Sequence, residues 1–585
     1  MNVTENGSIT VDVVRGEMQP WSDYEGHRKP TGGAVLQALL QDVLPQAARA
    51  LVVGPHARDV IELVAASSES VTVLLRSVGD ATTLEAAVQA TNVKVVTGAL
   101  DGFADRADER FDVVVAADGL DRVLGTDSPA MTWPERASAL ARTAAPQAVV
   151  VLGCDNEFAL TGLLDRRPVD NRHGDDEWRP LHDDPYRPTS PDQLVNALAG
   201  VGLAVEGLYA MVDVAGVPHT MLDRAAAAAT RPGRLAARLA VRALEASTVS
   251  TPLLAPVADS ADAAARAGLL DAVSPCWLAV CGATARTVYA EAADAASVLT
   301  ANLDEQGWRV RVSSAESAES GEIAESGASA GIAFSPAAVP GVVPDTESVE
   351  RVLLRLAAAE DVPGFRRVAA QIGEWARGRT EEDADVVICF DDLCVDGESF
   401  ARGVFGWVTT PPASTSELLA AAWQRFQDRL LRGHRRHPWP PWMVGDELVT
   451  AWLAMCGEEA GDEATAATVK RGREIADAVA AASGSDSGGD PEADLRTALA
   501  DAEAARVRAE ELAGHIFGLE RTIRFRDQQL RVRESRLRGL RSDLRTIQGS
   551  RAAKLAEIIR KAGTVRQPRR FARGVKRRLV RVLRR

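Results

Sequence analysis

Five short apolar runs between residues 50 and 152 constrain the fold of this chain more than any other feature. Continuous apolar runs of this length are typical of parallel strands that are buried on both faces, and a segment with helical spacing separates each run from the next. The chain therefore predicts an open α/β sheet that binds ligands outside the carboxyl ends of its strands. The five runs are Leu51–Val53, Val71–Leu75, Val93–Val96, Phe111–Val115 and Ala148–Leu152.

The residues that follow these runs define a candidate pocket, because the carboxyl ends of parallel strands meet at one edge of the sheet. The first turn contains Gly54, and a residue without Cβ lets a ligand approach the backbone closely. We predict a binding site at the strand tips, formed by Gly54, His56, Arg76, Gly98, Ala99 and Asp118.

Two segments resemble a known family. FDVVVAADGLDRV at 111–123 and VLGCDNEFALTGLL at 151–164, with the glycine turn at Gly54 and TGAL at 97–100, are similar to class I S-adenosylmethionine-dependent methyltransferases. More narrowly, residues 30–225 resemble actinobacterial methyltransferase-like proteins found with surface-glycan genes. The resemblance implies a Rossmann-like methyltransferase sheet, S-adenosyl-L-methionine as the cofactor at the strand tips, and a glycan or glycolipid as the methyl acceptor.

The chain departs from this family at two positions. Its first turn has only one glycine, Gly54, and Arg76 stands at the second strand tip, where family enzymes carry an acidic residue. A carboxylate accepts hydrogen bonds from the ribose hydroxyls, whereas a guanidinium accepts none. The sequence leaves two alternatives open: a domain that binds the cofactor or a relative, and a fold kept for structure.

Residues 165–194 form an irregular insertion rich in proline and aspartate, which precedes a helix capped at Ser190-Pro191. In the resembling family a segment at this place covers the acceptor pocket, so the insertion is either such a lid or a solvated loop. His173 and His182 are candidate general bases for an acceptor hydroxyl. With the neighbouring aspartates they are also candidate metal ligands, although each is more often an ordinary surface residue, and we predict no metal site.

The length of 585 residues predicts several domains. No run of 18 apolar residues occurs and the N-terminus lacks a signal pattern, so we expect a cytoplasmic protein. The six cysteines are scattered, which predicts reduced, buried thiols. The expected parts are an N-terminal extension at 1–29, the methyltransferase-like domain at 30–225, a linking helix at 226–250, a second mixed α/β or α+β domain at 251–460 with a disordered insert at 313–345, and a helix and flexible linker at 461–493.

The second domain holds two recognisable segments. ICFDDLCVDGESF predicts a hairpin that turns at Asp396-Gly397. HRRHPWPPW resembles an element of the same glycan-cluster proteins. Its Trp439 and Trp442 are either platforms for sugar rings or plugs in the domain core, and the second is the simpler interpretation.

The C-terminal part predicts a long coiled coil at 494–550. In it aliphatic residues, with two arginines among them, recur at spacings that alternate between four and three residues. We expect a homodimer through this coil. Residues 551–585 carry a net charge of +13 in a chain of net charge −15. This amphipathic basic tail predicts contact with an anionic membrane through Arg570, Phe571, Val575, Lys576, Arg577, Leu579, Val582 and Leu583.

Three functions remain possible on this sequence. The first is a methyltransferase that acts on a glycan or glycolipid precursor as a peripheral protein at the inner face of the plasma membrane. The second is a catalytically degenerate methyltransferase fold that serves as a coiled-coil scaffold on the membrane for glycan enzymes. The third, a nucleic-acid binder with a basic tail, is the least favoured because the rest of the chain is acidic.

Overall fold

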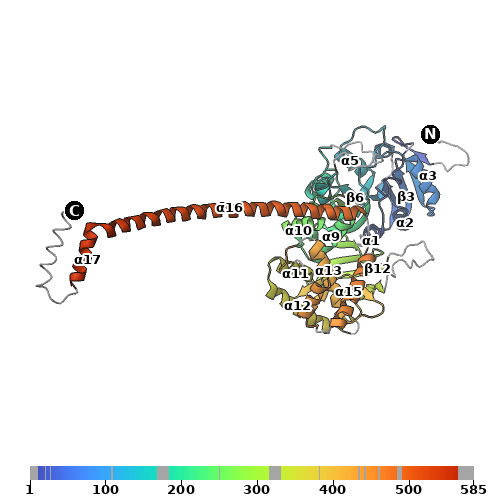
Figure 1. Cartoon of the computed structure of the whole chain (residues 1–585). Helices are drawn as coiled ribbons and strands as arrows, with labels where there is room; N and C mark the ends of the chain where they lie inside the picture. The colour runs from blue at the N-terminus through green and yellow to red at the C-terminus, as the bar shows by residue number, and fades with distance from the viewer. Residues whose placement is uncertain are drawn as a thin grey trace. The chain divides into compact units, whose positions relative to one another are not determined.

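The computed structural model describes residues 11–563, apart from residues 20, 27, 107–109, 168–183, 250, 315–330, 381–382, 433–434, 441–442, 444, 459–461 and 484–490. The chain forms two compact units, residues 1–488 and 489–585. Each unit is described by itself (Figure 1).

The first unit contains one large mixed sheet of 13 strands among the described residues, in the order β1-β4-β3-β2-β5-β6-β9-β7-β8-β10-β11-β12-β14. Strands β1 to β6 pair in parallel, whereas β9 is antiparallel to both β6 and β7. The strands are β1 Asp12–Val13, β2 Ala47–Val53, β3 Ser68–Leu75, β4 Val93–Thr97, β5 Phe111–Ala116, β6 Ala144–Asp155, β7 Val205–Val214, β8 Val217–Asp223, β9 Cys276–Cys281, β10 Val288–Glu291, β11 Ser297–Asp304, β12 Gly307–Ser314 and β14 Val342–Val343.

Helices cover both faces of the parallel part, which confirms the predicted mixed α/β class. Within β2, Val52 packs on the side of α1, α2 and α3, while Leu51 and Val53 pack on the side of α4, α5 and α7. This alternation explains why the strand is apolar at every position from Ala50 to Val53. The helices are α1 Ala34–Val43, α2 Arg58–Ala66, α3 Val78–Ala87, α4 Leu100–Arg106, α5 Trp133–Thr143, α6 Leu160–Leu164 and α7 Pro191–Gly200.

The sheet continues across the expected domain boundary at 225/226. Strand β9 lies between β6 and β7, although the sequence assigned these residues to a second domain starting at 251. The expected linking helix is α9, which packs on the face of β8, β10 and β11. The sequence of a buried apolar strand does not show which strand it pairs with. For this reason the domain boundary at 225/226 was placed wrongly. The helices of this region are α8 Arg224–Ala229, α9 Leu235–Ser247 and α10 Val257–Ala267.

A second lobe of the same unit is mainly helical and has its own core. The expected hairpin at Asp396-Gly397 is confirmed by the pairing of β15 with β16. Residues 331–345, which were expected to be disordered, include β13, β14 and a 3-10 helix, whereas residues 315–330 lie outside the described part of the chain. The elements are β13 Ile332–Phe334, η2 Pro336–Ala338, α11 Val349–Ala358, α12 Val362–Arg377, β15 Leu393–Asp396, β16 Ser399–Arg402, β17 Trp407–Thr409, α13 Thr415–Arg432, α14 Asp446–Met455 and α15 Asp462–Ala482.

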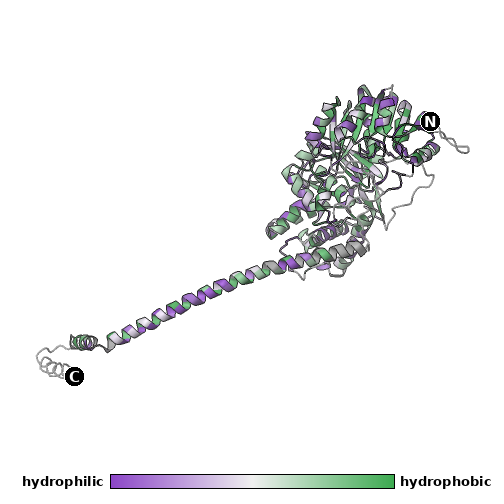
Figure 2. Cartoon of the chain, turned by 90° about the horizontal axis from the view of Figure 1, so that it is seen from above, coloured by the Kyte–Doolittle hydropathy of each residue, from purple (hydrophilic) through white to green (hydrophobic). Residues whose placement is uncertain are grey.

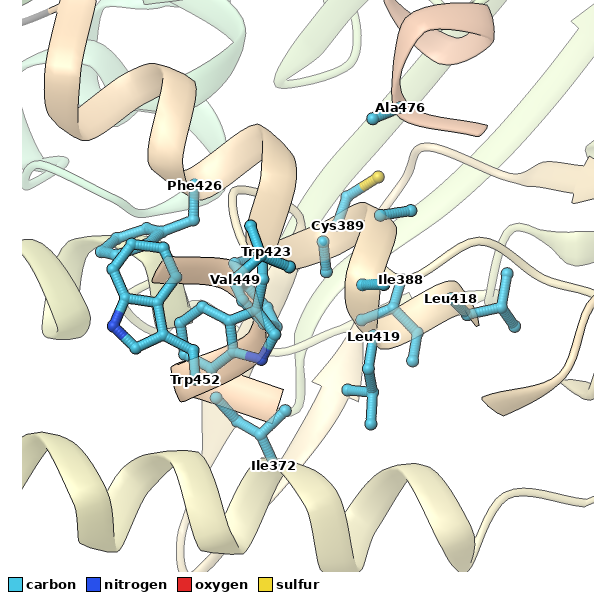
Figure 3. Close-up of a cluster of buried hydrophobic side chains, with 14 of the residues drawn as sticks. Ile372, Ile388, Cys389, Leu418, Leu419, Trp423, Phe426, Val449, Trp452 and Ala476 are labelled. Carbon is cyan, nitrogen blue, oxygen red and sulfur yellow. The ribbon is translucent and has the colours of Figure 1, made fainter. Parts of the chain in front are cut away.

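Aromatic rings fill the core of the helical lobe (Figure 3). Trp423 and Trp452 are fully buried, with ring centroids 5.2 Å apart. Trp439 joins them, 5.1 Å from Trp452 and 4.9 Å from Phe365. Trp439 is therefore a plug in the core, whereas Trp442 lies outside the described residues. Helix α15 contributes Val479 to the same core, so the lobe extends to residue 482 and not to 460.

The second unit contains α16, Pro491–Gly549, a continuous helix of 59 residues, and α17, Arg551–Gly563. Residues 564–585, including every predicted membrane contact, lie outside the described residues. Among the described residues, no helix has the length and apolar character needed to cross a bilayer.

Candidate functional site at the strand tips

The strand order reverses between β2 and β5, and such a switch point is where an open α/β sheet forms its ligand crevice. Gly54 ends β2 with φ +86°, a conformation that favours glycine. A Cβ at Gly54 would lie 3.9 Å from its nearest neighbours, the side chains of Asp118 and Val123. The turn geometry of a ligand-binding sheet is thus present at Gly54.

The chain's own N-terminal segment, residues 11–33 with residues 20 and 27 outside the described part, crosses these tips. It forms backbone hydrogen bonds with three of them in turn. Val14 N–H donates to Thr97 O at 2.8 Å, and Met18 N–H donates to Arg76 O at 2.7 Å. Thr31 then pairs with the Gly54 turn.

At that turn, Thr31 N–H donates to Pro55 O at 3.0 Å and Thr31 O accepts from Ala57 N–H at 2.9 Å. The amide of Ala57 stands at the start of α2, where a helix N-terminus otherwise attracts an anion. Gly32 packs so closely that a Cβ would come within 2.4 Å of the Ala57 methyl group. The segment therefore takes the backbone donor that an anionic ligand would use.

Arg76 is fully buried beneath the segment. Its Nε and Nη2 donate to the two carboxylate oxygens of Asp23 at 2.8 and 2.7 Å, and its Nη1 donates to Leu124 O at 3.1 Å. The Trp21 ring centroid is 5.5 Å from the guanidinium carbon. At the tip where the family places an acid for the ribose, this chain has a cation and supplies the acid itself.

Asp118 is also engaged on both oxygens. Its carboxylate accepts from Thr31 Oγ1 at 3.0 Å and from Arg122 through a bidentate pair with one bond of 2.9 Å. Arg28 lies 3.4 Å from Asp118 and 2.6 Å from Asp155. Although burial opposes its charge, these two carboxylates raise the pKa of Arg28 above its ordinary value.

His56 is completely buried and holds the Gly54 turn against β5. Its Nδ1 lies 3.1 Å from Gly54 O, and its Nε2 accepts from Ala117 N–H at 3.1 Å. This pair of partners suits only the neutral tautomer with a proton on Nδ1, because a protonated Nε2 accepts nothing. Burial lowers the pKa of His56. Tyr24 Oη donates to His56 O at 2.7 Å and seals the same turn.

The tip of β4 is closed in the same way. Gly98 has φ +147°, and a Cβ there would meet Val14 Cγ2 at 2.4 Å and Val14 O at 2.6 Å. Ala99 N–H donates to Arg15 O at 3.0 Å. All six predicted tip residues thus gather at one edge, where the N-terminal segment contacts them or fixes their neighbours.

The two candidate bases, His173 and His182, lie outside the described residues. The chain that follows them is anchored to α5, since Asp184 accepts from Arg136 Nη2 at 3.3 Å. Arg187 pairs with Asp121 at 2.8 Å. The predicted cap of α7 is confirmed, because Ser190 accepts from Gln193 N–H.

Other chemistry-bearing groups lie away from the tips. All six cysteines are free and buried, as predicted, and burial raises the pKa of Cys154 and Cys389 to about 12. No metal-binding group of three or more His, Cys, Asp or Glu occurs among the described residues. In the helical lobe a small hollow is lined by Trp375, Arg379 and Arg402 among others.

No family model and no curated protein matches this chain. The similar solved structures include N-methyltransferase NodS from Bradyrhizobium japonicum in complex with S-adenosyl-L-homocysteine, at 17% identity over 21% of this chain and 59% of that one, TM-score 0.17. Others are the CcbJ methyltransferase from Streptomyces caelestis, at 15% over 45% and 94%, TM-score 0.25, and an O-methyltransferase family protein from Burkholderia thailandensis, at 12% over 28% and 47%, TM-score 0.19.

This chain spans about three fifths of the length of NodS. Likenesses of this size carry no activity or residue role over to this chain. What the chain has is an α/β sheet whose strand order reverses between β2 and β5. S-adenosylmethionine is the cofactor that the resemblance of the sequence implies at its strand tips.

The tip residues do not fit that cofactor in the arrangement described. The amide of Ala57 and the carboxylate of Asp118 are bonded within the chain. Arg76 offers no acceptor to a ribose hydroxyl and already pairs with Asp23. The N-terminal segment therefore bonds to groups at the strand tips that a ligand there would use.

Proposed function

We propose that the protein is a methyltransferase-fold scaffold for cell-surface glycan or glycolipid biosynthesis, held as a peripheral protein at the inner face of the plasma membrane. The observation that carries the proposal is the closure of the strand tips by the N-terminal segment, above all the buried Arg76–Asp23 pair. The resemblance to surface-glycan proteins supports the pathway. The long helix and the basic tail support assembly on a membrane.

Calorimetric titration with S-adenosylmethionine and S-adenosylhomocysteine tests the closed site. The full-length protein should give no binding heat up to millimolar ligand, because displacing the segment breaks several buried hydrogen bonds first. Saturable binding at micromolar concentration would overturn the proposal.

A second candidate is a methyltransferase gated by this segment, with a glycan hydroxyl as acceptor and His173 or His182 as its base. The geometry of Gly54 favours it, since the turn keeps φ +86° and ordinary contact distances around the missing Cβ. In this case Asp23→Asn, which weakens the closure, should bind S-adenosylmethionine where the wild type does not. If Asp23→Asn does not bind S-adenosylmethionine although its N-terminal segment is shown to be open, this candidate is eliminated.

Flotation with vesicles tests the membrane role. The full-length protein should float with vesicles that contain anionic lipid, and the variant ending at residue 550 should not, because each Lys or Arg near such a surface contributes about 1 kcal/mol. Equal flotation of both proteins would discard the role of the tail. Binding of nucleic acid with a steep salt dependence that is lost in the same variant would instead support the third function.

A further inference from the structure

Helix α16 carries an apolar stripe that no other described residue of its own unit covers. Eleven residues from Leu512 to Ile547 recur at alternating spacings of four and three residues, so they lie on one face of the helix. The nine aliphatic residues among them are between 53% and 63% exposed. In Figure 2, hydrophobic residues recur among hydrophilic ones along α16.

We propose that this stripe is the seam of a parallel, in-register, two-stranded coiled coil with a second copy of the chain. The proposal deepens the self-association on which the proposed scaffold rests. In heptad notation the a positions are Ile516, Ile523, Leu530, Leu537 and Leu544, and the d positions are Leu512, Leu519, Arg526, Arg533, Leu540 and Ile547.

The first half of the seam favours two parallel strands. Isoleucine at a alternates with leucine at d, as in Ile516, Leu519 and Ile523, and this combination packs best in a parallel dimer. Neighbouring layers with leucine at both positions accept the same geometry. The seam thus supplies a self-complementary surface, and a second copy of α16 is its natural occupant.

Two arginine layers set the orientation. Arg526 and Arg533 occupy d positions, and each is followed at e by an acid, Asp527 or Glu534. In a parallel coil the d layer is flanked by the e residues of both helices, so each arginine meets a carboxylate of the other copy. Two guanidiniums and two carboxylates then leave each layer neutral. Within one chain Glu534 pairs with Arg538 at 3.4 Å, and this exposed pair is readily exchanged.

An antiparallel pair loses this compensation. There e positions face e positions, so Asp527 would oppose Asp527 or Glu534 of the other helix. Like charges in opposition disfavour that pairing.

The arginines also fix the register. When one helix is shifted by a heptad, Arg526 of one helix faces Leu519 of the other, and Arg533 of the second helix faces Leu540 of the first. The shifted coil therefore lacks a second layer in which arginine faces arginine. Only the unshifted alignment places each arginine layer against itself with its own acids. A polar layer of this kind specifies register at a cost in stability.

Cysteine cross-linking of the full-length chain tests the orientation, and the six natural cysteines are all buried. Under mild oxidation Leu519→Cys alone should form a disulfide-linked dimer, and so should Leu540→Cys alone. The double variant Ile516→Cys/Leu540→Cys should give only like-with-like links, because these positions are about 36 Å apart along a helix. A link between 516 and 540 in tryptic peptides would show an antiparallel coil and overturn the proposal.

Charge removal gives a second readout with opposite signs. Asp527→Asn/Glu534→Gln should raise the dissociation constant of the dimer about tenfold in the parallel coil. It should lower that constant if acids oppose each other in an antiparallel one. Gln528→Ala/Ser535→Ala, at positions outside the seam, is the matched control and should leave the constant unchanged.

The mass in solution tests self-association separately from the parallel register. Sedimentation should give a dimer, twice 62.2 kDa, at micromolar concentration. A monomer at that concentration would end both the coil and the assembly on which the scaffold rests. A dimer in which Leu519→Cys forms no link would leave self-association standing and refute only the parallel register.

Discussion

Replacing Asp23 by asparagine leaves the buried guanidinium of Arg76 without its carboxylate partner. The two side chains are only 5% and 1% exposed, and two charge-assisted hydrogen bonds join them. Asparagine keeps the size of the side chain, so the change removes charge and little packing. The variant therefore tests whether this pair holds the N-terminal segment on the strand tips.

The expected effect is large because water does not replace the lost partner. Removing one member of a buried ion pair costs about 3 to 5 kcal/mol. Since about 1.4 kcal/mol corresponds to a factor of ten, the population with an open segment should rise at least about 100-fold. Leu124 O and the Trp21 ring keep some contact with Arg76, which favours the lower end of this range.

Native-state hydrogen exchange measures this opening directly. The amides of Val14, Met18 and Ala57 are bonded between the segment and the strand tips, so they exchange when the segment leaves. Their exchange rates should rise at least about 100-fold in Asp23→Asn. Amides in the middle of β2 should not change, because the sheet stays folded.

Asp105→Asn is the matched control, because Asp105 in α4 pairs with Arg15 of the same segment. Arg15 pairs with Asp105 at 3.0 Å, but the two side chains are 54% and 57% exposed. An exposed pair is worth less than about 1 kcal/mol, so exchange should change less than about fivefold. If Asp23→Asn also changed the three amides by less than fivefold, the argument that this buried pair closes the site would be refuted.

Three further outcomes are expected. Below about pH 6.5 the wild type should lose up to about 1.4 kcal/mol of stability per pH unit through His56. The lowered pKa of His56 keeps it neutral in the folded protein, whereas the unfolded imidazole takes a proton. The thermal midpoint of His56→Gln should therefore fall less as the pH falls. Gly98→Ala should speed tryptic cleavage within the N-terminal segment, since its Cβ would clash with Val14, whereas Gly54→Ala should not, despite the backbone strain it introduces. Trp452→Ala should cost about 3 to 5 kcal/mol in the unfolding of the helical lobe, followed by near-UV circular dichroism.

The five strands were predictable because their signal is local. A run such as Phe111–Val115 is apolar at every position except Asp112, and the observed β5 extends it by one residue, to Ala116. The confirmed cap at Ser190 and the hairpin at Asp396-Gly397 likewise depend on neighbouring residues. Elements defined within about ten residues can be derived from propensity and spacing alone.

The closure of the site was not predictable in this way. Asp23 meets Arg76 across 53 residues, and a charged residue at a strand tip can face either a ligand or another part of the chain. The segment WSDYEGHRKP at 21–30 has no period, which explains why it was taken for a mere extension. Its aromatic residues, Trp21 and Tyr24, were the available signal, because solvated arms contain few aromatic side chains.

The position of β9 imposes an order of events on the growing chain. Strands β6 and β7 both pair with β9 and lie on either side of it, so the centre of the sheet stays incomplete until about residue 281 has been synthesised. Before then two apolar strands have open hydrogen-bonding edges, which invite pairing with other chains. A fragment that ends at residue 225 should therefore aggregate, although it contains every residue of the strand tips.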